Sequence, residues 1–286
     1  MLLGAFLIAF SGILFRKSHV SPVTGAFFRC FWALPFLWSL AVWEDRRLGA
    51  RSRSLRRAAW LGGAFFAADL ILWHYSIEYV GAGLATVLGN LQVAFVPLVA
   101  WAALGERPAG RVLATLPLVL SGVVLISGAL EKGAYGDDPA QGVVFGLATG
   151  LAYTGFILLL RAGSGDRQRV AGPLFDATLV GALGALAIGL VVGDADLVPS
   201  WPAHAWLTTL ALTSQVIGWL LISASLPRLP AALTSLLLTI QPVGSVILGA
   251  ILFAESPSGL QLLGVAAIVG GLVMVARVRA PASEGI

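Results

Sequence analysis

The sequence predicts an all-α polytopic membrane protein, with ten transmembrane helices arranged as two five-helix repeats of inverted topology. The first observation behind this prediction is composition. The 286 residues are 58% hydrophobic and only 11% charged, with a mean hydropathy of +0.91. Soluble domains carry about 25% charged residues, so most of this surface has to face lipid. The second observation is a series of apolar runs that approach the roughly 20 residues needed to cross a bilayer.

The third observation is an internal repeat. Residues 92–106 run from a Gln to a Glu, residues 241–255 do the same, and each segment is followed by a proline two positions later. The offset between the copies is 241 − 92 = 149. Without any gap, the same offset pairs Leu72 with Leu221, Ser76 with Ser225, Leu84 with Leu233, Gly110 with Gly259, and Gly122 with Gly271. A repeat this long indicates one structural unit written twice.

The apolar runs divide into two sets of five. Residues 1–130 form the expected first repeat, residues 131–141 an outer connecting loop, and residues 142–286 the second repeat with a short cytoplasmic tail. Five is an odd number, so the second copy enters the membrane from the opposite side, as in many secondary transporters. The expected helices span residues 2–15, 23–43, 58–77, 82–103, 112–130, 142–160, 171–192, 203–224, 231–253 and 260–278.

Loop charges predict the orientation. Positive residues favour cytoplasmic loops, and placing both termini in the cytoplasm puts fourteen of the 18 Lys and Arg residues there. Arg16 and Lys17 follow the first helix on the outer side and run against this sum. The fourteen are Arg46, Arg47, Arg51, Arg53, Arg56, Arg57, Arg107, Arg111, Arg161, Arg167, Arg169, Arg228, Arg277 and Arg279.

Several function classes find no support in the sequence. The Arg residues lie in short loops between apolar runs, which is the membrane pattern and disfavours nucleic-acid binding. There is no phosphate-binding Gly-Lys-Ser loop, so ATP-driven pumping by this chain is disfavoured. The three His residues are scattered and no cluster has metal-ligand spacing. We therefore expect no metal, no cofactor and no enzyme activity. The first helix has no charged n-region and no Ala-x-Ala site, which disfavours a cleaved signal peptide.

Short motifs carry a family resemblance. Residues 105–108 read Gly-Glu-Arg-Pro, residues 254–257 read Ala-Glu-Ser-Pro, and residues 27–29 read Phe-Phe-Arg. With Gln241 and Pro242 upstream of the second motif, this order resembles the EamA family of the drug/metabolite transporter superfamily. The first copy departs from the pattern, because Val93 follows Gln92 and the proline comes later. The resemblance implies a metabolite carrier that works by alternating access, and amino-acid exporters are the first members to compare.

Polar residues within the expected helices mark a candidate site. Asp69 lies eleven residues into its helix, about 16 Å deep at a rise of 1.5 Å per residue, and other polar residues reach a similar depth. Polar groups in hydrocarbon are costly and usually face a cavity or one another. We therefore predict a midplane cavity lined by the first four helices of each repeat. Its substrate-binding candidates are Ser11, Asp69, Trp73, Tyr75, Asn90, Gln92, Tyr153, Gln215, Trp219 and Gln241.

Some of these residues have structural alternatives. The Gln residues can bridge helices by hydrogen bonds instead of touching a substrate. Asp69 is either a proton-coupling carboxylate or the partner of Arg29. Asp176 is the counterpart of Arg29 in the second repeat, but it is expected about 10 Å below it, too far for a direct pair. Pro97 and Pro242 are expected to interrupt their helices and free carbonyl groups. We class these four residues, Arg29, Pro97, Asp176 and Pro242, as gating or structural.

Taken together, these patterns predict a secondary transporter of the bacterial inner membrane that exports small metabolites, with amino acids as the leading class. Its expected partners are a small-molecule substrate and the lipid bilayer. One alternative is a membrane enzyme acting on lipid-linked substrates, and another is a carrier of drugs or sugars. Nothing in the sequence demands an oligomer, and a homodimer stays open.

Overall fold

The computed structural model describes residues 1–104, 110–164, 168–225, 238 and 240–276. Every regular element in this part of the chain is a helix, which agrees with the predicted all-α class. In chain order the elements are α1 (Leu2–Ala9), α2 (Ser11–Ser18), α3 (Pro22–Phe31), α4 (Leu34–Leu48), α5 (Arg53–Gly89), α6 (Gln92–Leu104), α7 (Gly110–Ile126), α8 (Pro139–Gly163), α9 (Ala171–Val192), α10 (Ala203–Leu210), the π-helix η1 (Ala211–Gly218), α11 (Trp219–Ser225), α13 (Ile240–Phe253) and α14 (Gly259–Ala276).

Five stretches are long and apolar enough to cross a membrane, so the chain is a multi-pass membrane protein by length and composition. They are Pro22–Leu48, Arg53–Val96, Pro139–Gly163, Ala171–Val192 and Ala203–Ser225. Shorter apolar helices cover Leu113–Ile126, Ile240–Phe253 and Gly259–Met274. The ten predicted helices do not map one to one onto these elements. The ninth was expected to begin at residue 231 and the tenth to end at residue 278, and both positions lie outside the described residues, as do residues 105–108 of the first motif.

Capping residues explain where several helices begin. Ser21 accepts a hydrogen bond from the Thr24 amide at the start of α3, and Ser52 accepts one from the Leu55 amide at the start of α5. Asp138 does the same for α8, where Pro139 occupies the first position. A side-chain oxygen at this position satisfies one of the orphan amides of the first turn. A proline there sacrifices no bond, because its amide would be unpaired in any case.

Three predicted helices are broken in two. α1 and α2 are separated at Phe10, and the freed carbonyl of Ala9 accepts a hydrogen bond of 2.8 Å from the Ser245 hydroxyl. α3 and α4 are separated at 32–33, just before Pro35, whose missing amide cannot continue the helix. Such breaks are tolerated at membrane depth only where the freed backbone groups find partners inside the protein.

The expectation that Pro97 interrupts the fourth predicted helix is wrong. This helix is interrupted at 90–91 between α5 and α6, and not at Pro97, which lies within α6. The third and fourth predicted helices also run together in α5, which passes through Gly81 with φ 80° and ψ 168°. A residue without a Cβ adopts this conformation readily, so the chain turns there without ending the element. Pro242 lies in the first turn of α13.

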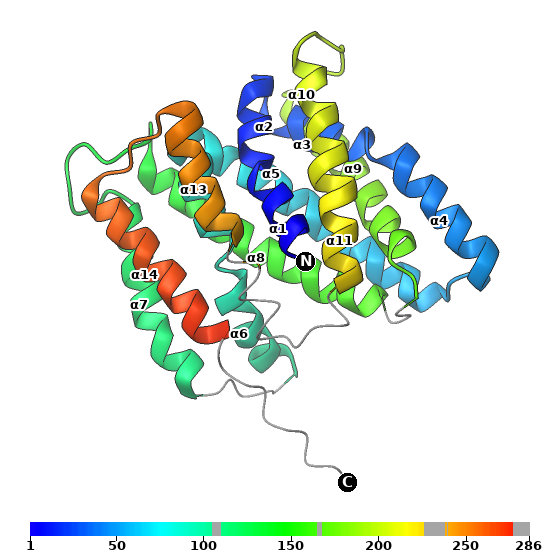
Figure 1. The fold of residues 1–286 in the computed structure, drawn as a ribbon, viewed down its shortest axis with the longest axis horizontal. Coiled ribbons are helices and arrows are strands. Elements are labelled where there is room, and N and C mark those ends of the chain that lie inside the picture. The colour runs from blue at the N-terminus through cyan, green and yellow to red at the C-terminus, as the bar shows by residue number, and fades with distance from the viewer. Residues whose placement is uncertain (105–109, 165–167, 226–237, 239, 277–286) are drawn as a thin grey trace.

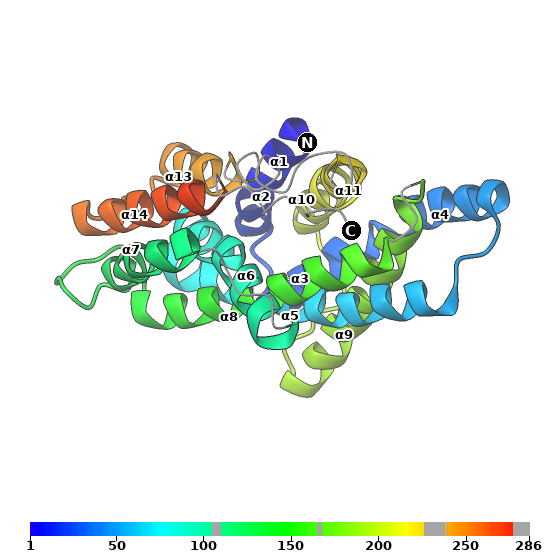
Figure 2. The ribbon, with the colours of Figure 1, turned by 90° about the horizontal axis from the view of Figure 1, so that it is seen from below.

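The helices of the two predicted repeats interleave. α5 packs against α8, α9 and α13, while α3 and α4 pack against α9. α7 and α14 lie side by side at one end of the molecule, and α4 lies at the other end (Figures 1 and 2). A Cβ on Gly122 would come within 2.7 Å of the Gly264 carbonyl, so glycine allows the close approach of α7 and α14. Small residues at such contacts are typical of membrane helices.

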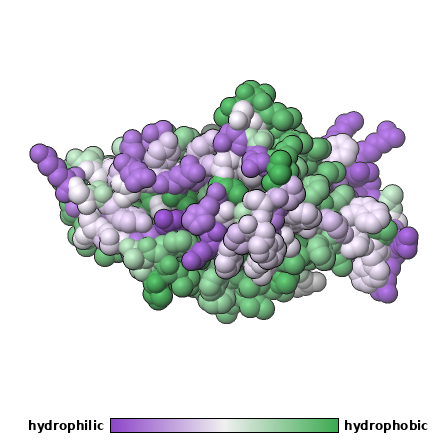
Figure 3. Space-filling view, turned by 90° about the horizontal axis from the view of Figure 1, so that it is seen from above, coloured by the Kyte–Doolittle hydropathy of each residue, from purple (hydrophilic) through white to green (hydrophobic). Residues whose placement is uncertain are grey.

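Large apolar side chains cover much of the outer surface. Leu61, Leu151, Leu183 and Val191 are 58%, 53%, 57% and 87% exposed. In Figure 3 the hydrophobic surface lies along the upper and lower edges of the view, while hydrophilic groups gather in the middle of the face toward the viewer and at its left and right tips. This distribution suits a protein whose flanks contact lipid.

Candidate functional site

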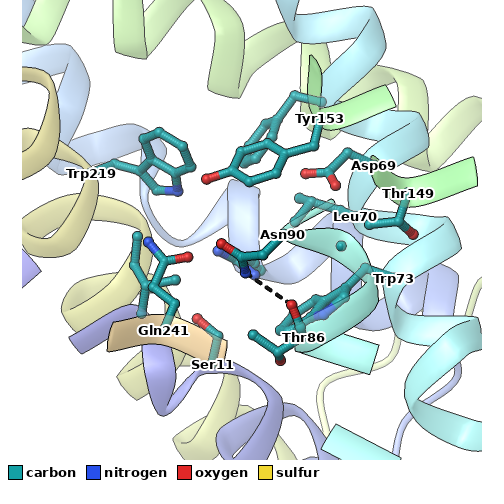
Figure 4. A pocket seen from close by; sticks show the side chains of 14 residues that line it. Ser11, Asp69, Leu70, Trp73, Thr86, Asn90, Thr149, Tyr153, Trp219 and Gln241 are labelled. Atoms are coloured by element: carbon teal, nitrogen blue, oxygen red, sulfur yellow. Dashed lines mark hydrogen bonds between the residues drawn. The ribbon is translucent and has the colours of Figure 1, made fainter. Parts of the chain in front are cut away.

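A cavity of about 50 Å³ lies at the centre of the helices (Figure 4). Its described walls come from α1, α2, α3, α5, α8, α11 and α13, together with the break after α5, and none of its described lining residues comes from α7 or α14. A volume of this size holds only a few water-sized groups. The lining residues are Ile8, Ser11, Arg29, Phe66, Asp69, Leu70, Trp73, Thr86, Gly89, Asn90, Thr149, Tyr153, Trp219 and Gln241.

Two opposite charges face this cavity without pairing. Arg29 and Asp69 are 3% and 7% exposed, yet no ion pair joins them within the described part of the chain. The Arg29 Nε donates a hydrogen bond of 3.1 Å to Gln215, whose amide nitrogen donates one of 3.0 Å to the Thr178 hydroxyl. The Arg29 guanidinium also lies 5.8 Å from the centre of the Trp73 ring. Gln215, which does not line the cavity, thus holds the Arg29 side chain from behind the cavity wall.

Three donors in the cavity wall have no hydrogen-bond partner in the described structure. They are the Ser11 hydroxyl, the Trp219 indole nitrogen and the Gln241 amide nitrogen. In the view of Figure 4, Trp219 and Gln241 lie on one side of the cavity and Asp69 lies on the other. A buried donor without a partner costs about 1–3 kcal/mol. The arrangement therefore favours a ligand, or water, that accepts hydrogen bonds at this wall.

Other polar groups around the cavity are occupied by their own helices. The Thr86 hydroxyl donates to the Ala82 carbonyl at 2.7 Å, and the Asn90 amide nitrogen donates to the Thr86 carbonyl at 2.9 Å (Figure 4). The Thr149 hydroxyl donates to the Phe145 carbonyl at 2.9 Å. These bonds satisfy the donors, so what Thr86, Asn90 and Thr149 can still offer a ligand is mainly acceptor oxygens.

Aromatic rings form the rest of the wall. The ring centres of Phe66 and Phe156 are 4.4 Å apart in a stacked arrangement, and Trp219 lies edge-on to Phe156 at 5.1 Å. Tyr153 is edge-on to Trp219 at 6.1 Å. Edge-to-face pairs at these separations are favourable, so the cluster fixes the Trp219 indole in one orientation. An apolar lining with a few placed polar groups is typical of a small-molecule site.

Comparison with known proteins identifies the family. The sequence profile described as the EamA-like transporter family matches residues 1–128 and again residues 140–277. The chain belongs to the EamA-like transporter family. Membership makes it a multi-pass membrane transporter of the drug/metabolite type with a small-molecule substrate, as the motifs around Glu106 and Glu255 predicted.

Solved structures share the fold of this EamA-like transporter. One of them, described only as "Crystal structure of protein", superposes with a TM-score of 0.61 at 16% identity, and the match covers 96% of this chain and 94% of that chain. At this identity the likeness concerns the fold alone. No curated protein matches the sequence.

The structure brings most of the predicted site residues of this EamA-like transporter together. Ser11, Asp69, Trp73, Asn90, Tyr153, Trp219 and Gln241 all line the cavity, and so does Arg29, which we had classed as gating or structural. Gln92 and Gln215 are buried at 4% and 0% exposure but are not among the described lining residues. Tyr75 is directed elsewhere, with its hydroxyl 3.5 Å from an Asp194 carboxylate oxygen.

Asp176 takes part in a separate ion pair. Its carboxylate accepts a hydrogen bond of 2.8 Å from Arg51 and lies 3.8 Å from the Arg56 Nε. No ion pair with Arg29 occurs among the described residues, in keeping with the separation that helix rise predicted. Asp176 therefore joins α9 to the start of α5 and stands apart from the cavity.

Some lining residues were not singled out from the sequence. On α5, Phe66 lies three residues before Asp69, and Leu70 lies three residues before Trp73. Thr149 lies four residues before Tyr153 on α8. Residues three or four apart share a helix face. This spacing is a signal that could have found all three once Asp69, Trp73 and Tyr153 had been chosen.

Proposed function

We propose that this EamA-like protein is a secondary transporter that exports small zwitterionic metabolites, with amino acids as the leading class, through its central cavity. The observation that carries the proposal is that Arg29 and Asp69 both line the cavity and form no ion pair with each other in the described structure. Two opposite charges in a buried site ordinarily pair, because an uncompensated buried charge is costly. A ligand that carries both charges would compensate each of them.

The donors in the wall support the same ligand class. A carboxylate accepts several hydrogen bonds and binds Arg strongly, so Arg29 and the free donors of Ser11, Trp219 and Gln241 suit the carboxylate end. Asp69 suits the ammonium end. The small volume favours small cargo, and alternating access would come from movement of one repeat against the other.

The direct test is transport by the purified protein in liposomes. Vesicles that contain the protein and are loaded with a single radiolabelled amino acid should show efflux that protein-free vesicles loaded in the same way lack. Other small amino acids should compete with this efflux. Neutral sugars and hydrophobic cationic drugs serve as comparison cargo. Efflux of those compounds with none of any amino acid would overturn the zwitterion proposal, and chemical modification of a lipid-linked substrate would favour the enzyme alternative.

Gln241 and Gln92 provide a matched pair of variants. Both are buried glutamines related by the offset of 149, but only Gln241 lines the cavity. Gln241→Ala should raise KM about tenfold or more, since a hydrogen bond to a charged group contributes about 1.5–3 kcal/mol. Gln92→Ala should leave KM unchanged in protein that folds and inserts. Equal KM changes in the two variants would contradict the proposal that Gln241 binds the carboxylate end of the substrate.

We place the protein in the bacterial inner membrane with both termini in the cytoplasm, on the strength of its loop charges. In a Cys30→Ser background, single cysteines at Asp137→Cys and Ser52→Cys test this orientation with a membrane-impermeant thiol reagent added to intact cells. The outer-loop position 137 should be labelled and position 52 should not. The reverse labelling pattern would show that both termini lie outside the cytoplasm.

A further inference from the structure

The carboxylate of Glu255 joins three helices at one end of the molecule. Glu255 follows α13 and is 4% exposed. One of its oxygens accepts a hydrogen bond of 2.8 Å from the Ala82 amide and one of 2.5 Å from Arg16, and the other accepts one of 3.1 Å from the Gly83 amide. Both oxygens are therefore occupied by groups from α2 and α5.

The backbone of α5 and the backbone of the linker after α13 both have the conformation that this contact requires. The positive φ of Gly81 interrupts α5, so the amides of Ala82 and Gly83 begin a new run of helix and lack partners within it. A negative charge is stabilised at such an N-terminus. On the other side, Ala254 has a φ of 52°, and the Glu255 amide donates a hydrogen bond of 3.2 Å to the Gly249 carbonyl. The linker thus turns back to bring the carboxylate to α5.

Three glycines leave room for the carboxylate. A Cβ on Gly81 would come within 2.8 Å of Glu255, and one on Gly83 within 3.2 Å. A Cβ on Gly249 would overlap the second carboxylate oxygen. Contacts this short require one of the groups to move, so larger residues at these positions would displace Glu255.

Arg16 completes the cluster from α2. Its guanidinium lies 4.4 Å from the centre of the Phe253 ring, and the Lys17 ammonium lies 5.3 Å from the same centre. The Arg16 side chain is 31% exposed, whereas that of Glu255 is 2% exposed. Arg16 and Lys17 are the two positive residues that oppose the general loop-charge pattern. They face the second repeat at the end of the molecule where α2 terminates.

Each helix that meets Glu255 also supplies a wall of the cavity. Arg16 is five residues from Ser11 on α2, Ala82 is four residues from Thr86 on α5, and Glu255 is fourteen residues from Gln241 at the start of α13. Separating the three helices at this end therefore requires breaking the bonds to one carboxylate.

We propose that Glu255 is a gate residue, which closes the cavity on the Arg16 side of the membrane and releases Arg16 and the α5 amides when the cavity opens to that side. The inference rests on the proposed transport through this cavity by alternating access. Under it, the Glu in the motif at residues 254–257 has a mechanical role and does not contact the cargo.

Cysteine accessibility tests the gate without any substrate. Cys30 is the sole cysteine of the chain, so Cys30→Ser with Thr149→Cys places one reporter thiol in the cavity wall. A membrane-impermeant methanethiosulfonate is added separately from each side, using intact cells and inverted vesicles. Glu255→Gln and Arg16→Gln should each raise the labelling rate from the Arg16 side about tenfold or more, as expected for loss of a charge-assisted hydrogen bond. They should also lower the rate from the other side.

Glu131→Gln is the matched control. Glu131 accepts a hydrogen bond from the Ser258 hydroxyl, three residues after Glu255 and at the same end of the molecule. Its described contacts do not include α2 or α5, so its labelling rates should equal those of the parent. Arg16→Lys, which keeps the positive charge, should recover most of the closed behaviour.

The outcomes separate the gate from the proposed function. Parent-like labelling from both sides in Glu255→Gln and Arg16→Gln would overturn the gate. If Glu255→Gln does not fold, Arg16→Gln alone decides, because it leaves the bonds to Ala82 and Gly83 in place. A labelling shift in a protein that moves no amino acid would retain the gate and reject the zwitterion proposal. Amino-acid efflux with unchanged labelling would do the opposite.

Discussion

Asp69→Asn is expected to slow amino-acid efflux by about ten- to 150-fold, the equivalent of the 1.5–3 kcal/mol that a charged hydrogen bond contributes. The reason is that Asp69 faces the cavity and no cation pairs with it in the described structure, so a substrate ammonium is its natural partner. The measurement compares an amino acid with its deaminated analogue. The parent should prefer the amino acid, and Asp69→Asn should lose that preference.

Arg29→Gln is the reciprocal variant, and it should erase the preference for an amino acid over its decarboxylated amine. Each variant is thus matched to the chemical group that it no longer binds. If Asp69 carries a coupling proton instead, Asp69→Asn should abolish the pH dependence of transport and keep the substrate preference. If Asp69→Asn matches the parent in rate, preference, pH dependence and thermal stability, Asp69 has neither role.

The second large effect concerns stability. Asp176→Ala should lower the free energy of unfolding by about 3–5 kcal/mol, because it leaves a buried charge without its close partner. The Arg51 side chain is 6% exposed and lies 2.8 Å from Asp176, and its next carboxylate, on Asp45, is 3.8 Å away and 42% exposed. Denaturant unfolding in detergent, followed by near-UV circular dichroism, measures the change.

Arg56→Gln is the control for this prediction. Arg56 also approaches Asp176, at 3.8 Å, but its side chain is 48% exposed. An exposed pair contributes about 0–1 kcal/mol, so this variant should unfold close to the parent. A parent-like unfolding curve for Asp176→Ala would show that Arg51 finds another partner or reaches solvent.

The sequence predicted the depth of the polar side chains in the membrane better than the direction in which they point. Asp69, Tyr153 and Gln241 were chosen by counting residues into apolar runs, and all three line the cavity. Gln92 satisfies the same count and the same repeat position as Gln241, yet it does not line the cavity. The break at 90–91 separates α6 from α5 and uncouples their rotations. Counting fixes height along a helix, whereas rotation depends on breaks that the hydrophobic pattern does not mark.

The positions of Arg29 and Gln215 relative to the cavity differ from the sequence interpretation for a similar reason. Both are polar and deep, so composition alone cannot say which of them faces the cavity. In the structure Gln215 lies behind Arg29 and hydrogen-bonds to it. The pairing spans 186 positions in the chain, and it arises from the packing of α3 against η1. Contacts between distant segments of this kind are not encoded in local periodicity.

The π-helical turn η1 has a consequence for how such a site can be altered. Residues 211–218 make wider turns than an α-helix, and such turns hold an additional residue. Each residue of such a turn rotates the chain by less than the roughly 100° of an α-helical residue, so the wide turn absorbs the additional residue. Deleting one residue there would restore the ordinary ladder and leave α10 and α11 close to their present relative orientation, with Trp219 still on the cavity wall. The length of this membrane span can therefore change by one residue at η1 without changing which side chains face the cavity.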